Sequence, residues 1–445
     1  MKKHLTLLML FLGFSGAFAQ DKPIAKSAFS LKEAQAFAAE NAYSVKEVKY
    51  NISQAEQQVR EYTSIGLPQV NLQGTFNQFV VIPTTVIPAG SLFPGSPPTE
   101  AKFGTRYNTQ VGASGSQMLF DGSFFVGIQA AKALVELTKE GQRKSEIDVK
   151  DNVTQAYFTV LIVQETKKLL EQSLVNLQKT QTETQAFYKS GFAEENDVDQ
   201  FDILVGNLNN QLSKINANIE NAKGLLKFQM GMSVKDPIEL TDNLEVVGEL
   251  ANNPALLNPT LDPTTNIDHR LLTQSMNLQN LNAKRIKMGY LPNARLVGNI
   301  STSAMRNEFD MPGGRWFPTI LWGVNIGVPV FDGFMKDAGI KKAKLDGVKT
   351  RNTLDQLEQG LALQLETAKT DFISASNQLK NEERSLALAK KVRDKALIKY
   401  KEGVGSSMEI TQAENQLVAT QGNYFQALMS KLTAKAKLDK LMGTY

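Results

Sequence analysis

Four segments of the chain alternate apolar and polar residues, which is the period of a β-strand. The clearest is 320–330, where isoleucine, tryptophan and valine fill most alternate positions, and 70–77 follows the same pattern. The alternation is weaker in 105–119 and 294–305. All four segments are close to the roughly 9 to 11 residues that a tilted strand needs to cross a bilayer.

The polar faces of these strands favour a membrane hairpin over a soluble one. They carry Asn, Gln, Ser, Thr and Gly, whereas the exposed face of a soluble sheet is usually rich in Lys and Glu. No charged residue occurs in 62–99, 107–120 or 316–331. We therefore expect two membrane hairpins, at about 69–120 and about 293–331.

Prolines are expected to bracket the hairpins, because proline removes a backbone donor from the ladder. The positions expected outside the strands are Pro68, Pro83, Pro292 and Pro318. Pro329 falls near the end of the last predicted strand. The Pro- and Gly-rich stretch 83–98 predicts a long loop.

After each hairpin the pattern becomes helical. From Phe201 to Leu226 apolar residues recur at alternating steps of four and three, which predicts a coiled-coil seam. The helical pattern is continuous over 124–189 and again over 334–401. A helix of that length measures on the order of 100 Å, which is too long for a compact domain and suits a wide compartment.

The chain repeats these features in order, which indicates an internal duplication. The repeated motifs are Leu67-Pro68 and Leu291-Pro292, Phe120-Asp121-Gly122 and Phe331-Asp332-Gly333, and Tyr188-Lys189-Ser190-Gly191 and Tyr400-Lys401-Glu402-Gly403. We expect a first repeat over 20–230 and a second over 266–445, joined by a connector at 231–265. Each repeat would contain a helix, a β-hairpin and a long helical hairpin.

The ends of the long helices are expected at the tips of the helical hairpins, about 188–199 and about 400–410. Gly191 and Gly403 would end the helices, because glycine readily adopts the left-handed conformation that follows a helix.

The first 19 residues predict a secretory signal peptide. Lys2 and Lys3 precede an apolar stretch, and Ala17 and Ala19 form a small-residue cleavage site. No later apolar run is long enough for a membrane-spanning helix. The mature chain is therefore expected to reach a compartment outside the cytoplasm.

Composition weighs against enzymes and nucleic-acid binding. The 445 residues include no cysteine and two histidines, of which only His269 lies outside the signal peptide. Thiolate metal sites and cysteine nucleophiles are excluded, and no cofactor site is expected. The net charge is +4 with no basic block, so we expect no nucleic-acid partner.

Four lipid-facing strands cannot close a barrel, and an open strand edge in lipid leaves backbone groups unpaired. The strands must therefore combine with those of other copies in one barrel. Two, three or four copies would supply enough strands to close it. Polar inner faces would then surround a water-filled channel that the helices continue. The alternative is a secreted periplasmic coiled-coil scaffold or binding protein with soluble hairpins.

The duplicated Leu-Pro, Phe-Asp-Gly and Tyr-x-x-Gly motifs resemble the TolC-like outer membrane factors over nearly the whole mature chain. The resemblance implies an α+β membrane protein in which three chains form a 12-stranded β-barrel and a periplasmic α-barrel. The connector 231–265 would join the termini in an equatorial belt. The implied function is an exit duct in the outer membrane, with outer-membrane lipid, a periplasmic adaptor and an inner-membrane pump as partners, in efflux or type I secretion.

The resemblance also implies an aperture at the tips. By their spacing after the second tip, Glu409 and Gln412 would line it, and only Glu409 keeps the acidic character of the family. A latch would join Asp197 to Tyr400, but Gly405 stands where the family has arginine. The alternative for Glu409 is a solvated glutamate in the first turn of a helix, where the helix dipole favours it.

The grooves around the tips are the implied docking site for the adaptor. The residues expected there are Tyr188, Gly191, Glu194, Glu195, Asp199, Gly403 and Gly405. Their acidic members would suit a basic partner surface, although such a cluster also suits a solvated helix start.

Overall fold

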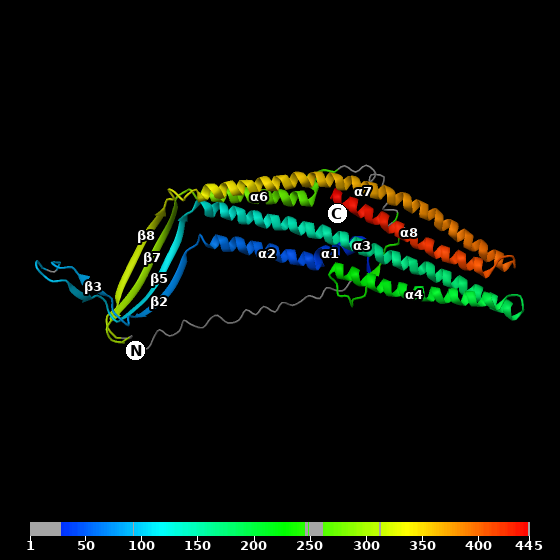
Figure 1. Ribbon diagram of the computed structural model, residues 1–445, viewed down its shortest axis with the longest axis horizontal. Coiled ribbons are helices and arrows are strands. Elements are labelled where there is room, and N and C mark those ends of the chain that lie inside the picture. The colour runs from blue at the N-terminus through cyan, green and yellow to red at the C-terminus, as the bar shows by residue number, and fades with distance from the viewer. Residues whose placement is uncertain (1–27, 92, 245–247, 249–260, 311–312, 444–445) are drawn as a thin grey trace.

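The computed structural model of the chain describes residues 28–91, 93–244, 248, 261–310 and 313–443. The molecule is elongated, with a β-sheet at one end and helices along the rest of its length (Figure 1). The predicted signal peptide and most of 245–260 lie outside the described residues.

The chain passes twice through the same series of elements. In order they are β1 (Ala28–Phe29), α1 (Leu31–Asn41), α2 (Tyr43–Ser64), β2 (Gln69–Gln78), β3 (Thr84–Ile87), β4 (Thr99–Lys102), β5 (Tyr107–Phe120), α3 (Gly122–Lys189), α4 (Glu195–Met230), β6 (Glu239–Leu240), η2 (Pro263–Thr265), α6 (Ile267–Met288), β7 (Asn293–Arg306), β8 (Phe317–Gly327), α7 (Met335–Lys401) and α8 (Ser407–Met442). Each half therefore contains a helix, a strand hairpin and a pair of long helices, and the predicted fold class is confirmed.

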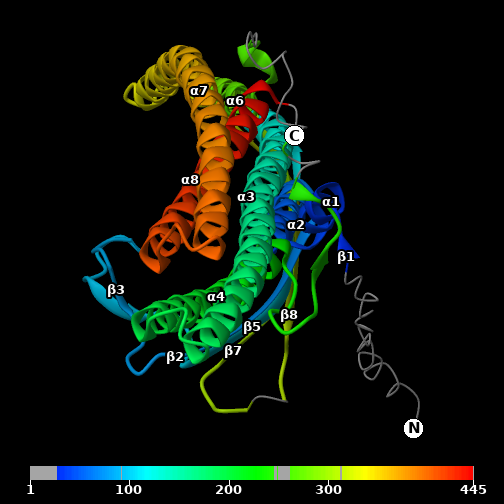
Figure 2. The same cartoon turned by 90° about the vertical axis from the view of Figure 1, so that its right-hand side faces the viewer.

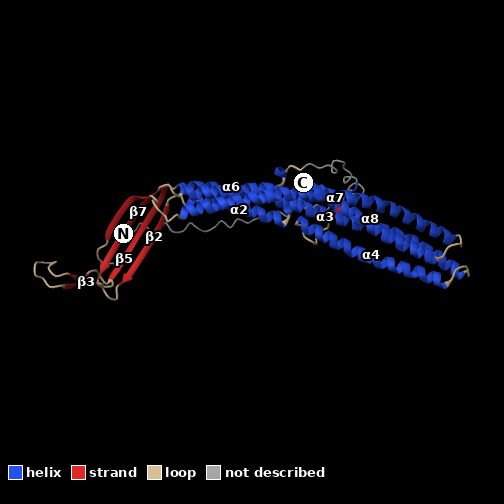
Figure 3. Cartoon of the chain, turned by 45° about the horizontal axis from the view of Figure 1, so that its top comes forward, coloured by secondary structure: helices blue, strands red, loops and turns tan. Residues whose placement is uncertain are grey.

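The large sheet joins the two strand hairpins in the order β2-β5-β7-β8. All neighbouring strands are antiparallel, and β5 pairs with β7 although they belong to different repeats. Strands β2 and β8 are the two edges, each paired on one side only within the part of the chain that the structure describes. The sheet is a single layer at the far end of the molecule from the hairpin tips (Figure 3).

The register aligns the alternating patterns of all four strands. One row across the sheet consists of Leu72, Ala113, Ile300 and Ile320. The next row, whose side chains point to the other face, consists of Gln73, Gly112, Ser301 and Thr319. One face of the sheet is therefore apolar and the other is polar and uncharged at this level.

Two details of the strand prediction are wrong. Pro318 lies inside β8, where it is aligned with Thr302, and β8 ends at Gly327, before Pro329. Pro318 is the second residue of β8, and a proline near the start of a strand removes a donor only from the end of the ladder. The expected loop at 83–98 also contains part of a small ribbon, in which β3 pairs with β4.

The long helices α3 and α7 contain 68 and 67 residues. The seam predicted for α4 is buried or half-buried along its length, with Phe201 and Leu226 fully covered. These residues pack against α3 and the second helical hairpin. Burial of one stripe along the helices stabilises them, since long isolated polar helices gain little from propensity alone.

The main hydrophobic core lies near the middle of the molecule. The buried Tyr157 of α3 donates a hydrogen bond to the carbonyl oxygen of Phe29 at 3.0 Å, and its hydroxyl lies 3.1 Å from a carboxylate oxygen of Asp242. The same carboxylate accepts from the backbone N–H of Leu31 at 2.7 Å. The start of the described chain and the segment after α4 are thus tied to α3 at this level.

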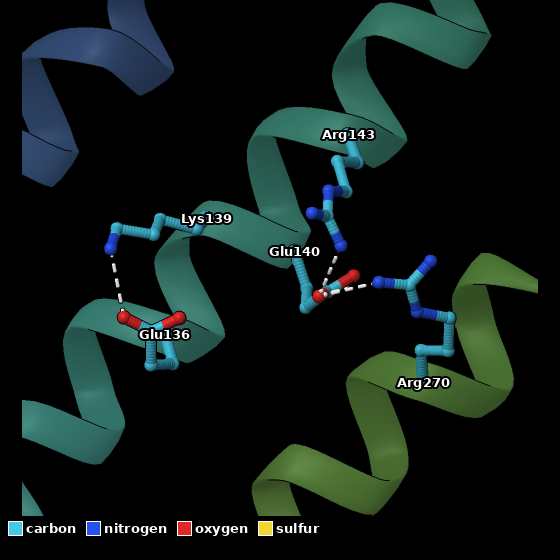
Figure 4. A network of polar contacts seen from close by, with 5 residues as sticks. All are labelled: Glu136, Lys139, Glu140, Arg143 and Arg270. Atoms are coloured by element: carbon cyan, nitrogen blue, oxygen red, sulfur yellow. Dashed lines mark hydrogen bonds and ion pairs between the residues drawn. The ribbon is translucent and has the colours of Figure 1, made fainter.

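A polar network joins α3 to α6 between this core and the sheet. One oxygen of Glu140 accepts from Arg143 at 2.8 Å and from Arg270 of α6 at 2.7 Å (Figure 4). Glu136 and Lys139 form a separate pair on the other side of α3. Of these pairs, the bridge to Arg270 links the two repeats, and a charge-assisted hydrogen bond of this kind adds geometric specificity to the contact between α3 and α6.

Candidate channel mouth at the helical hairpin tips

The two helical hairpins end side by side at the end of the molecule opposite the sheet (Figure 2). In the first turn, Gly191 has φ +79° and Phe192 donates its N–H to the carbonyl oxygen of Phe187 at 2.8 Å. In the second, Gly403 has φ +73° and Val404 donates to the carbonyl oxygen of Lys399 at 3.0 Å. Both glycines therefore adopt the left-handed conformation expected of a residue that follows a helix.

Side chains cap the helices that leave the tips. At the start of α4, Glu194 and Asp197 form a reciprocal capping box. At the start of α8, the Ser406 hydroxyl accepts from the backbone N–H of Glu409 at 3.2 Å. Each cap satisfies backbone donors that have no partner within the helix.

Polar contacts connect the two hairpins at the tips. The Ser407 hydroxyl donates to a carboxylate oxygen of Asp197, and the Tyr400 hydroxyl lies 3.0 Å from that of Thr184. Lys401 forms an ion pair with Glu183 at 2.8 Å. Asp197 and Tyr400 therefore lie in one contact region, but each bonds to another residue, and no hydrogen bond joins the two in the described part of the chain.

Burial alters the chemistry of Tyr400. Its ring packs edge-on against Phe201, with centroids 5.6 Å apart. Burial raises the pKa of the Tyr400 hydroxyl above its ordinary value, the negative charge of Asp197 adds to this, and the hydrogen bond with Thr184 opposes it. Tyr400 is therefore a neutral hydrogen-bonding group at physiological pH.

The predicted aperture residues are exposed on the first turns of α8. Glu409 and Gln412 both face solvent within the single chain. One carboxylate oxygen of Glu409 lies 3.9 Å from the Lys399 ammonium, and both side chains are at least half exposed. A pair with this distance and exposure holds Glu409 only weakly.

Most of the predicted docking residues are also exposed. Tyr188, Glu194, Glu195 and Asp199 face solvent, as do both tip glycines at 191 and 403. They lie beside exposed apolar side chains, which are Phe187, Phe192, Val404 and Met408. The tips therefore combine acidic and apolar surface.

Gly405 is in close contact with the end of α7. A Cβ atom at this position would lie 2.9 Å from the Cβ atom of Lys399 and 3.0 Å from the backbone nitrogen of Tyr400. Its N–H donates to the carbonyl oxygen of Lys399 at 3.1 Å. The turn is thus built around glycine, and an arginine side chain here would require the backbone to move.

Glu414 is a notable residue that the sequence reasoning missed. Its side chain is 2% exposed between α7 and α8, and one oxygen lies 3.5 Å from a guanidinium nitrogen of Arg393. The other oxygen has no partner among the described residues. Burial raises the pKa of Glu414, and Arg393 opposes the rise. The signal was available, because Glu414 interrupts the apolar seam formed by Ile410 and Leu417.

Among the described residues, no group of three or more His, Cys, Asp or Glu side chains could hold a metal ion. No described helix has both the length and the apolar character needed to span a membrane.

Comparison with known proteins identifies the family. Residues 37–231 and 279–444 match the outer membrane efflux proteins. The chain belongs to that family. The matched segments contain both strand hairpins and both helical hairpins, so the family assignment covers the tips as well as the sheet.

The relatives and structural neighbours agree with this assignment. The chain is 22% identical to the cation efflux system protein CusC of Escherichia coli strain K12 over 71% of its own length and 69% of that protein. It is also 22% identical to the outer membrane efflux protein BepC of Brucella suis, over 76% and 73% of the two chains. The fold is similar to a crystal structure of CusC, with a TM-score of 0.69, 18% identity and coverage of 93% and 92%.

This outer membrane efflux protein is located in the outer membrane and extends into the periplasm. The family consists of efflux channels rather than enzymes. The four-stranded sheet, in which Arg295 and Arg306 of β7 are the charged residues, is the part suited to lipid, and the charged helices are the part suited to an aqueous compartment.

Proposed function

We propose that the protein is a passive exit duct, formed by three copies, in a tripartite efflux system. The observation that carries this proposal is the single-layer sheet, whose edge strands are each paired on one side only among the described residues and whose apolar rows share one face. In lipid, both edges need partners. Edge strands β2 and β8 run antiparallel to each other across the sheet, so β8 of one copy can pair with β2 of the next in the same sense as every other pair.

Three copies would supply twelve strands, and a barrel of that size with polar inner rows encloses water. The helices would continue the wall into the periplasm. Glu409 and Gln412 would face the axis at the narrow end, where three Glu409 carboxylates would attract cations. Asp197, Tyr400 and their partners Ser407 and Thr184 would hold each pair of hairpins together at that end.

The adaptor would dock at the tips. The exposed surface there includes Tyr188, Gly191, Glu194, Glu195, Asp199, Gly403 and Gly405, together with apolar side chains such as Phe192. A partner with basic and apolar residues would be complementary to it. The inner-membrane pump would supply the energy for transport.

Efflux is favoured over protein secretion by the relatives. CusC is named as a cation efflux protein and BepC as an efflux protein. The pump would select much of what enters such a duct.

Single-channel recording tests the aperture. In planar bilayers, Glu409→Gln should lower cation selectivity because it removes three negative charges from the mouth. Gln412→Glu should raise it for the opposite reason. Glu220→Gln, an exposed change on α4 far from the tips, is the matched control and should leave selectivity unchanged.

Unchanged selectivity in both tip variants would show that these residues do not line the aperture. The duct itself is tested by fractionation and native mass measurement. Recovery of the protein from the periplasm without detergent, or as a monomer in detergent, would contradict the duct and favour a soluble scaffold.

A further inference from the structure

Along most of the tip half, α7 and α4 lie on the two outer sides with α8 and α3 between them (Figures 1 and 3). At the tip itself, the inner side of α7 also contacts α4, where Tyr400 packs against Phe201. At the other end of the molecule the outer strands are β8 and β2. The side that carries α7 continues into β8, and the side that carries α4 continues through α2 into β2 (Figure 1). The molecule therefore has two long outer sides. One is formed by α7 and β8, and the other by α4, α2 and β2.

The free side of α4 is acidic near the tip. Glu195, Asp199 and Asp202 are exposed, and they lie on the side of the helix opposite the buried Phe201 and Leu204. Ile203, which is 64% exposed, lies among them. Asp202 accepts a hydrogen bond from Gln181 of α3, and Glu195 and Asp199 have no ion-pair partner in the described part of the chain.

The free side of α7 is basic at the corresponding position. Lys391, Lys395 and Lys399 recur every four residues, away from the buried Ala389 and Ala396. The exposed Leu388 and Val392 accompany them.

Few charges of the same chain compensate these lysines. Lys399 has the distant contact with Glu409 at 3.9 Å. The nearby Asp394 is paired with Arg393 at 3.0 Å. Lys391 and Lys395 form no ion pair with any residue that the structure describes.

The two charged stripes lie at similar heights along the molecule. Tyr400 bonds to Thr184 and Lys401 to Glu183, and all four residues lie a few positions before the turn of their own hairpin. The two hairpins therefore end at nearly the same position along the long axis of the molecule. At about 1.5 Å per residue, both stripes lie within about 15 Å of their tips. Rotation about a cyclic axis preserves height, so a ring of copies brings the acidic stripe of one copy level with the basic stripe of the next.

We propose that the acidic stripe of α4 (Glu195, Asp199 and Asp202, around Ile203) docks onto the basic stripe of α7 (Lys391, Lys395 and Lys399, beside Leu388 and Val392) of a neighbouring copy. This inference rests on the proposed ring of copies and adds the surface that closes it at the periplasmic end. In that ring Glu195 and Asp199 face the neighbouring copy, and the surface left for the adaptor includes Tyr188, Gly191 and Glu194. The apolar residues form the centre of the contact and the ion pairs form its rim. Because the pairs are near solvent, the contact weakens as ionic strength rises.

Disulfide cross-linking tests the pairing directly, and the absence of native cysteine makes the result unambiguous. Asp199→Cys combined with Lys395→Cys should give covalent trimers on mild oxidation of the full-length protein in detergent. The control combines Asp199→Cys with Lys344→Cys, an exposed lysine of α7 more than 50 residues from the tip. It should give no covalent oligomer.

Charge reversal provides a second test. Lys391→Glu/Lys395→Glu and Asp199→Lys/Asp202→Lys should each lower the dissociation temperature of the trimer at low salt, and combining the two sets should restore it. The matched control Lys179→Glu/Lys189→Glu changes the charge equally on exposed positions of α3 and should have little effect.

The outcomes separate this proposal from the proposed function. If the protein forms a native trimer but gives only intrachain disulfides, or none, the docking of α4 on α7 is wrong. The proposed function as a duct is then unaffected. The same holds if the combined reversal does not restore the trimer. A reduced protein that forms no trimer at all overturns the duct itself.

Discussion

A buried carboxylate in the seam between α7 and α8 shows how one residue can make hairpin stability depend on pH. Burial raises the pKa of Glu414 above that of an unfolded chain, despite the opposing charge of Arg393. The native state therefore binds a proton at a higher pH than the unfolded state does. It follows that stability rises as the pH falls from neutral through the native pKa, and the charged form is the costly one.

We predict that Glu414→Gln unfolds at a higher temperature than the parent protein at pH 8, by a few degrees, with a difference that shrinks toward pH 5. Circular dichroism during heating in detergent measures this, and Glu402→Gln, which changes an exposed charge at the tip, serves as the control. A lower unfolding temperature for Glu414→Gln at every pH would contradict this prediction. It would mean that losing the ion pair with Arg393 costs more stability than removing the buried charge gains.

At the scale of elements, the two Phe-Asp-Gly turns have the same sequence but different conformations. Asp121 caps α3 by accepting from the N–H groups of Ser123 at 2.8 Å and Phe124 at 3.3 Å. In the second copy, Gly333 and Phe334 both have φ +66°, and Phe334 is the N-cap residue that precedes α7. A left-handed conformation costs a residue other than glycine roughly 1–2 kcal/mol, so the second turn is strained.

This difference predicts opposite effects of glycine at equivalent turns. Phe334 is 70% exposed, so Phe334→Gly should remove the strain and leave stability unchanged or raise it by about 1 kcal/mol. Phe124 stacks on Tyr62 with ring centroids 6.0 Å apart, so Phe124→Gly should destabilise by about 2 kcal/mol or more. Chemical denaturation of the two variants measures both, and equal losses would contradict the strain at Phe334.

The elements that sequence predicts well are those fixed by local periodicity. The long helices and the four strands follow from spacing alone, because one buried stripe or one buried face repeats along each of them. Pro318 was misplaced because β8 begins at Phe317, one residue before it, and that start is fixed by pairing with Ser303 of β7 rather than by a local pattern. The bond between Ser407 and Asp197 spans 210 residues of sequence, and no local pattern contains it. Gly405 could be recognised as unusual, but the contact that requires it could not.

At the scale of the whole molecule, the register of the sheet decides which side of the wall meets lipid. Ile320 lies in the apolar row and the adjacent Thr319 in the polar row, so neighbouring residues have opposite environments in the closed barrel. A lysine facing lipid near the middle of a strand costs about 2–4 kcal/mol, whereas one facing a water-filled lumen costs little. In a ring of identical copies that cost is incurred once per chain.

We therefore predict that Ile320→Lys strongly reduces the amount of trimer recovered from outer membranes, whereas Thr319→Lys assembles normally and lowers cation selectivity in planar bilayers. The two variants carry the same charge one residue apart, so general effects of lysine on expression or solubility are matched. Trimer yield is measured on non-denaturing gels of membrane extracts. If Thr319→Lys failed to assemble and Ile320→Lys succeeded, the assignment of the two faces would be reversed, and the barrel could not enclose the polar rows that make it a channel.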